Sequence, residues 1–95
     1  MRYRIFWTTL ALKDLEEMRN YIQQDNPDAA KREAERIRKS VERLVHFPRR
    51  GRQLMSVSSV RELLSGNYRI FYRVISSQIQ IARVYHMKRR PIFIS

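Results

Sequence analysis

The sequence predicts an α+β fold, in which an antiparallel helix hairpin packs on one face of a mainly antiparallel sheet in the order β-α-α-β-β-β. Three observations favour it. A short alternating segment lies near the N-terminus, two long segments carry apolar residues at helical spacing, and the C-terminal half alternates again. With 95 residues the chain has room for one domain, which we expect to span residues 1–95.

The first strand is expected over residues 3–7 (YRIFW), with Tyr3, Ile5 and Trp7 on one face. A helix over about residues 9–24 should follow, because its apolar positions recur every three or four residues. These positions are Ala11, Leu15, Met18 and Ile22. Thr8 or Thr9 can cap this helix.

The second helix is expected over about residues 27–46. Asn26 serves as its N-cap and Pro27 as its first residue, which is a favoured combination at a helix start. Its apolar stripe consists of Ala30, Ala34, Ile37, Val41 and Leu44. The short connection between the helices makes them an antiparallel hairpin, and each stripe needs a partner surface.

A sheet supplies that surface, with strands predicted over residues 59–64, 67–76 and 79–86 and turns between them. The last strand alternates irregularly, so either a bulge near Arg83 re-aims its end or both of its faces are partly covered. The helices can cover only one face of the sheet. We therefore expect Phe71 to be exposed on the other face, between Arg69 and Arg73.

The strongest compositional signal is charge: 20 Lys plus Arg stand against 9 Asp plus Glu, a net charge of +11. Such a surplus favours an acidic partner, which could be nucleic acid, an acidic protein or an anionic membrane. The absence of cysteine excludes disulfides and thiolate catalysis. No metal-ligand spacing, glycine-rich phosphate loop, signal peptide or membrane-spanning run is visible, so we expect a soluble protein with no cofactor and no metal.

The candidate binding residues are cations, with one histidine, on the predicted strands, at the end of the last strand and in the loop after the second helix. Those of the strands and the strand end are Arg61, Arg69, Arg73, His86, Lys88, Arg89 and Arg90. Those of the loop are Arg49, Arg50 and Arg52. Arginine forks suit bidentate contacts with phosphate or carboxylate.

Catalysis is the alternative role for part of this set. RNA cleavage by the 2′-hydroxyl needs a base, an acid and cations around the phosphorane. His86 could be the base or the acid, and Arg69 and Arg89 the cations. Glu62 and Tyr85 are the only nearby candidates for the second proton transfer, and no residue is firmly assigned as catalytic. A histidine at a strand end is more often a packing residue.

Five segments in one order resemble the RelE/ParE toxin superfamily of bacterial type II toxin–antitoxin systems. They are YI-x-x-DNP-x-AA (21–30), L-x-x-FP-x-x-GR (44–52), VREL (60–63), YRIFYRV (68–74) and V-x-H-x-x-RR (84–90). The resemblance covers nearly the whole chain and implies the same β-α-α-β-β-β fold.

The superfamily contains two activities. RelE-like members cut mRNA in the ribosomal A site, whereas ParE-like members inhibit DNA gyrase. The resemblance places Arg69 and Arg89 at phosphate-contacting arginines of the ribonuclease branch, and His86 within one position of a catalytic histidine found in some members. However, a lysine of that branch falls at Glu62, and its C-terminal helix with a catalytic tyrosine is absent, Ser95 standing near that position.

The DNP-x-AA, FP-x-x-GR and VREL segments look like the ParE side, so the resemblance implies a gyrase inhibitor that acts in the cytoplasm and serves in plasmid stabilisation. A RelE-like endoribonuclease, acting on the ribosome and its mRNA, is the alternative. A degenerate, non-toxic paralogue that binds antitoxin or operator DNA is the second alternative. The toxin branches imply a cognate antitoxin, acidic and partly disordered, in a toxin–antitoxin hetero-oligomer and with no membrane partner. We also expect the apolar C-terminal residues of PIFIS (91–95) to dock on something.

Overall fold

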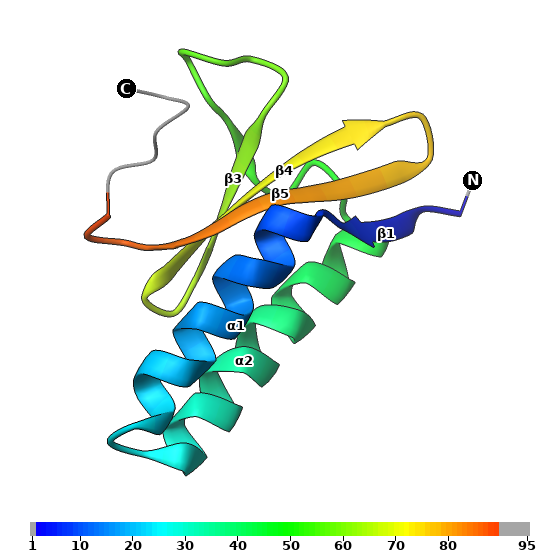
Figure 1. Cartoon of the computed structure of the whole chain (residues 1–95). Helices are drawn as coiled ribbons and strands as arrows, with labels where there is room; N and C mark the ends of the chain where they lie inside the picture. Colours follow the sequence, from blue (N-terminus) through cyan, green and yellow to red (C-terminus); the bar gives the residue numbers. More distant parts are fainter. Residues whose placement is uncertain (1, 90–95) are drawn as a thin grey trace.

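The computed structural model describes residues 2–89, and its elements follow the predicted order with one addition, the short strand β2 (Figure 1). The elements are β1 (Arg4–Trp7), α1 (Thr9–Gln23), α2 (Pro27–Glu42), the 3₁₀ turn η1 (Arg43–Val45), β2 (Arg52–Gln53), β3 (Arg61–Ser65), β4 (Tyr68–Ile75) and β5 (Gln78–His86). The predicted α+β class is confirmed. The predicted second helix ends earlier than residue 46, because its last turn tightens into η1.

The five strands form one sheet in the order β1-β5-β4-β3-β2. Strands β2 to β5 pair antiparallel with their neighbours, and β1 joins the edge of β5 in parallel. The helix hairpin supplies the crossover that a parallel neighbour requires. The mainly antiparallel sheet is therefore as predicted.

The helices begin at the predicted caps. The Thr8 side chain accepts a hydrogen bond from the N–H of Ala11, and the Asn26 side chain accepts one from the N–H of Ala29. Pro27 is the first residue of α2. Figure 1 shows α1 and α2 side by side against one face of the sheet, as the two apolar stripes predict.

A bulge interrupts β5 beside Arg83. Phe71 pairs with Arg83, but the next residue of β4, Tyr72, pairs with Ile81, so Ala82 is the extra residue on β5. The alternation therefore shifts by one position, and Ile81 and Val84 both reach the core between sheet and helices. Of the two explanations offered for the irregular pattern, the bulge near Arg83 is confirmed.

The main core lies between the sheet and the helices. It contains the predicted stripe residues Ala11, Met18, Ile37, Val41 and Leu44. The sheet contributes Leu63, Ile70, Tyr72, Ile79, Ile81 and Val84.

The prediction of an exposed Phe71 is wrong. Phe71 is fully buried, in a second cluster with Leu54, Val60 and Tyr85 against which Val57 also packs. The serine-rich segment before β3 carries three of these apolar residues and folds over the second face of the sheet. When this segment folds over the sheet, the Phe71 ring and the apolar side chains of the segment are removed from water together, and this burial is favourable.

Within residues 2–89, no helix is both long and apolar enough to cross a lipid bilayer.

Candidate functional site

A buried carboxylate, Glu62, lies at the centre of the second face and binds two of the predicted cations. The Glu62 side chain is 4% exposed, and its Oε2 lies 2.7 Å from Nε of Arg69. Its Oε1 lies 3.0 Å from Nη2 of Arg52. We call these three residues the Glu62 network. Both carboxylate oxygens are engaged by guanidinium groups, so Glu62 offsets one of the two positive charges and holds Arg69 in place.

Two aromatic rings, Phe71 and Tyr85, lie beside the Glu62 network and contact arginine side chains. The guanidinium of Arg83 lies 4.6 Å from the ring centre of Tyr85, and that of Arg89 lies 4.5 Å from it. The ring of Phe71 meets Tyr85 edge-on at 6.0 Å and has Arg69 5.4 Å from its centre. Cation–π contacts of this kind add to the ion pairs of Arg69 and Arg83 and help to hold the guanidinium group of Arg89.

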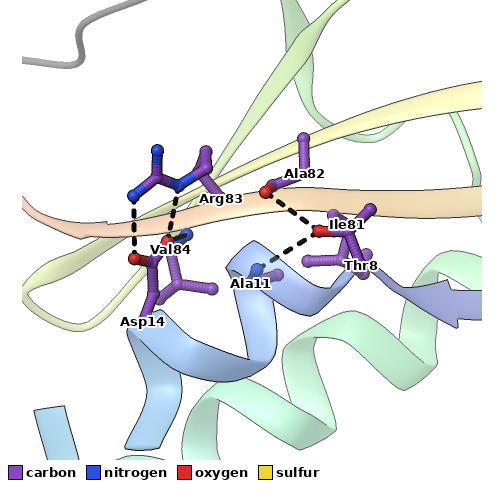
Figure 2. A network of polar contacts seen from close by, with 7 residues as sticks. All are labelled: Thr8, Ala11, Asp14, Ile81, Ala82, Arg83 and Val84. Carbon is purple, nitrogen blue, oxygen red and sulfur yellow. Dashed lines mark hydrogen bonds and ion pairs between the residues drawn. The ribbon is translucent and has the colours of Figure 1, made fainter. Parts of the chain in front are cut away.

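Arg83 is tied to the helix layer as well. Its Nε and Nη2 donate to the two carboxylate oxygens of Asp14 on α1, at 2.8 and 2.9 Å (Figure 2). Asp14 also accepts the backbone N–H of Val84 at 3.0 Å. The hydrogen bond to Asp14 raises the pKa of the Arg83 guanidinium above its ordinary value. Arg83 is therefore a structural cation.

The end of β5 brings together four of the predicted site residues: Arg69, His86, Lys88 and Arg89. His86 and Lys88 are exposed, and the backbone N–H of Lys88 donates to Nδ1 of His86 at 3.1 Å. Nη1 of Arg69 lies 3.4 Å from the carbonyl oxygen of Arg89. His86 and Arg89 line a hollow of about 390 Å³ between α1 and the end of the sheet. The ring of Tyr68, 5.3 Å from that of His86, forms part of the wall.

The two candidates for a second proton transfer, Glu62 and Tyr85, are both buried. Glu62 is engaged by Arg52 and Arg69, and Tyr85 lies between two guanidinium groups. A general acid or base must reach the proton that it moves. Of the three proton-transfer candidates only His86 is open to solvent, and its Nδ1 already accepts a hydrogen bond.

The remaining predicted cations lie elsewhere. Arg49, Arg61 and Arg73 line a separate hollow of about 660 Å³ beside the far end of β4. Arg50 lines a third hollow with Phe47, Pro48 and Arg49. Arg52 belongs to β2 rather than to a loop. The predicted cations therefore lie in two groups at opposite ends of the sheet, with Arg50 in the loop apart from both. Arg90 lies outside the described residues, as does PIFIS.

The structural contribution of Asp14 was not predicted from the sequence. On a helix, an aspartate between apolar positions looks like an ordinary solvent-facing residue, and nothing local points to a partner in the last strand. Among residues 2–89, no three side chains of the metal-ligating types gather at one place.

Known proteins resemble this chain over most of its length. A family model described as "ParE toxin of type II toxin-antitoxin system, parDE" matches residues 5–91. A Sinorhizobium fredii protein named "Putative toxin Y4kP" is 42% identical over 87 residues, which make up 90% of this chain and 88% of that protein. Toxin RelE2 of Caulobacter vibrioides is 37% identical over 87 residues, or 90% of this chain and 97% of that protein.

Solved structures share the fold. The chromosomal ParDE toxin–antitoxin system of P. aeruginosa contains a chain that matches with a TM-score of 0.79 at 24% identity, covering 90% of this chain and 96% of that one. The RelBE2 toxin–antitoxin complex of Mycobacterium tuberculosis gives a TM-score of 0.67 at 23% identity, covering 90% and 99%.

Proposed function

This chain belongs to the ParE toxin family of type II toxin–antitoxin systems, and on that premise we propose that it inhibits DNA gyrase by binding, without catalysing a reaction of its own. The proposal selects the ParE-like activity within the RelE/ParE superfamily. Both it and the ribonuclease alternative require the protein to act in the cytoplasm, where gyrase and ribosomes work.

The observation that carries the proposal is the pairing of Arg69 with buried Glu62. A phosphate-binding arginine in a nuclease must present its charge to the scissile phosphate. Here the Nε of Arg69 lies 2.7 Å from a carboxylate that is 4% exposed. A phosphate approaching Arg69 would have to compete with this carboxylate, which by resemblance stands where RelE-like enzymes carry a lysine.

Proton transfer is also poorly provided for. In the neutral His86 ring, the hydrogen bond from Lys88 to Nδ1 leaves the proton on Nε2. To act as a base, the ring would have to accept a proton at Nδ1 and lose this bond. Glu62 and Tyr85 are buried behind arginines, so neither supplies a second accessible group.

A cognate antitoxin is the second part of the proposal. The net charge of +11 favours an acidic, partly disordered segment that folds along this chain in a hetero-oligomer. Support comes from the structural relatives, since the P. aeruginosa protein is part of a ParDE toxin–antitoxin system and the M. tuberculosis one of a RelBE2 toxin–antitoxin complex.

The ribonuclease alternative rests on one geometric observation. Arg69, Arg89 and His86 do gather at one end of the sheet, beside the hollow between α1 and β5. The relative of Caulobacter vibrioides bears the name Toxin RelE2. This alternative would require a proton carrier other than the lysine and tyrosine of that branch.

Parallel assays of the purified protein distinguish the two activities. We expect loss of supercoiling by gyrase and no cleavage of mRNA on stalled ribosomes. Site-specific mRNA cleavage with supercoiling unaffected would overturn the proposal.

The variant His86→Gln provides a second comparison. It should inhibit gyrase as the wild type does, whereas in a ribonuclease this substitution would lower the cleavage rate by orders of magnitude. If the wild type were harmless in cells without antitoxin, the degenerate paralogue would be the better description.

A further inference from the structure

A group of three arginines lies away from the Glu62 network, at the far end of the sheet. Strand β3 pairs with β4 only as far as Tyr72, whereas β4 continues to Ile75 beside β5, and Figure 1 shows this longer hairpin. Beside the extension lies the hollow of about 660 Å³ lined by Arg49, Arg61 and Arg73. Ser58, Ser59 and Gln53 also line it. We call it the three-arginine hollow.

The charges of these arginines are not neutralised within the protein. Among residues 2–89, Arg49, Arg61 and Arg73 form no ion pair, and no carboxylate lines the hollow. Arg52, Arg69 and Arg83, by contrast, each bind a buried carboxylate. Like charges gathered at one place repel one another unless an anion joins them. The three-arginine hollow therefore has the electrostatics of an anion site.

Hydrogen bonds hold the Arg61 guanidinium group and the loop backbone that carries Arg49. Nη1 of Arg61 donates to the carbonyl oxygen of Gly51 at 2.8 Å and to that of Arg49 at 3.4 Å. The buried hydroxyl of Tyr72 donates to the carbonyl oxygen of Pro48 and accepts the N–H of Gly51, both at 2.8 Å. The loop that carries Arg49 is thereby fixed to β3 and β4. A site held in this way loses less conformational entropy when it binds an anion.

We propose that the three-arginine hollow binds phosphate groups of a nucleic-acid backbone. Its side chains offer guanidinium, hydroxyl and amide donors, and together they carry three positive charges. A single carboxylate could neutralise only one of these charges. Successive phosphates along a strand present several oxygens and more than one charge, which matches forked arginine donors. The inference stands apart from the proposed gyrase inhibition, because it concerns a different group of residues and does not depend on the target.

The test is the salt dependence of binding to a short fluorescein-labelled DNA duplex, measured by fluorescence anisotropy. The variant Arg49→Gln/Arg73→Gln removes two exposed members and leaves Arg61, with its structural bonds, unchanged. We expect a loss of about tenfold in affinity for each arginine. The slope of log K against log salt should fall by about 2, since each phosphate contact contributes about 0.9.

The matched control is Arg19→Gln/Arg32→Gln, which removes the same charge from two exposed helix residues that also form no ion pair within the described chain. It should change affinity and slope little. Equal losses in both variants would overturn the inference, because binding would then reflect net charge alone. Unchanged binding in the Arg49/Arg73 variant would overturn it as well.

Two further probes separate other sources of the anion. If inorganic phosphate bound to the wild type and not to the Arg49/Arg73 variant while the duplex bound equally to both, the hollow would be a free-phosphate site and the inference would fail. If a polyglutamate peptide lost affinity in the variant and the duplex did not, the hollow would be a protein-docking surface. Thermal unfolding of each variant, expected to match the wild type, excludes misfolding as the cause of a loss.

Discussion

Asp14 and Arg83 lie 69 residues apart in the sequence and form a bidentate ion pair that joins helix α1 to strand β5. β1 ends at Trp7, opposite Ile81. In the described part of the chain, the residues of β5 that follow the bulge therefore have no neighbouring strand on the β1 side. The chain turns into α1 at Thr8, whose N–H and hydroxyl both donate to the carbonyl oxygen of Ile81. Six residues later Asp14 accepts the N–H of Val84. Helix α1 thus satisfies the backbone groups that β1 leaves unpaired.

Replacing Asp14 by Asn should destabilise the protein by about 3 kcal/mol, because the guanidinium of Arg83 loses its carboxylate in a largely buried place. The amide can still accept the N–H of Val84, so the loss reports the ion pair. Chemical denaturation measures it. Glu16→Gln, an exposed change on the same helix, should cost under about 0.5 kcal/mol. A loss in Asp14→Asn no larger than in this control would show that the pair contributes nothing.

Replacing Glu62 by Gln should lower the free energy of unfolding by about 2 kcal/mol, because Arg69 would be left half-buried without a carboxylate. The double variant Glu62→Gln/Arg69→Gln should recover part of this loss, since no unpaired charge remains. A double-mutant cycle by denaturant unfolding gives the coupling energy. If the losses of the two single variants were additive, Glu62 and Arg69 would not be coupled and the Glu62 network would be contradicted. The control is Glu42→Gln, at an exposed position of α2.

Burial raises the pKa of the Tyr72 hydroxyl above its ordinary value of 10.0. The folded state then keeps this proton at pH values where the unfolded chain releases it. Stability is therefore fully present below the unfolded pKa and is lost as the pH rises from there through the folded pKa. Tyr72→Phe should be less stable at neutral pH, having lost two hydrogen bonds, but should lose less stability on going to alkaline pH. Tyr21→Phe, at a residue that is 76% exposed, should keep the wild-type alkaline loss, and an identical loss in all three proteins would contradict the assignment.

The turn between β4 and β5 contains Ser76 with a φ of 54°, a backbone conformation that residues other than glycine rarely adopt. Ser76→Gly should therefore stabilise the protein by about 0.5–1 kcal/mol. Ser77, whose φ is not positive, provides the matched control, because Ser77→Gly should only add unfolded-state freedom and destabilise. Thermal unfolding of both variants measures the two changes in stability. Equal changes would contradict backbone strain at Ser76.

Much of the fold could be predicted because local patterns agree with it. The cap at Asn26 and Pro27, the apolar stripes of the helices and the alternation of β4 are properties of neighbouring residues. The irregular alternation of residues 79–86 pointed to a bulge near Arg83 as one of two explanations, and the pairing with β4 confirms it. The two-residue strand β2 was not visible, because it has no pattern of its own and exists only through its pairing with Glu62 and Arg61.

The candidate site was harder to predict because it depends on long-range pairs. The alternation of β4 placed Arg69 and Arg73 on one face, yet the first is bound to Glu62, and the second lies in a separate hollow. Phe71 was expected to be exposed and is buried, because the loop with Leu54 and Val60 covers it. Which carboxylate meets which arginine is decided by the register of β2 to β4, and sequence spacing does not carry that information.

The most direct test of the central claim is a titration of gyrase supercoiling with the purified protein. Inhibition by binding predicts a loss of supercoiling that rises with the ratio of toxin to gyrase and saturates, is reversed by the cognate antitoxin and leaves ribosome-bound mRNA intact. Undiminished supercoiling at a large excess of toxin, in a preparation that cuts mRNA on the ribosome, would contradict it.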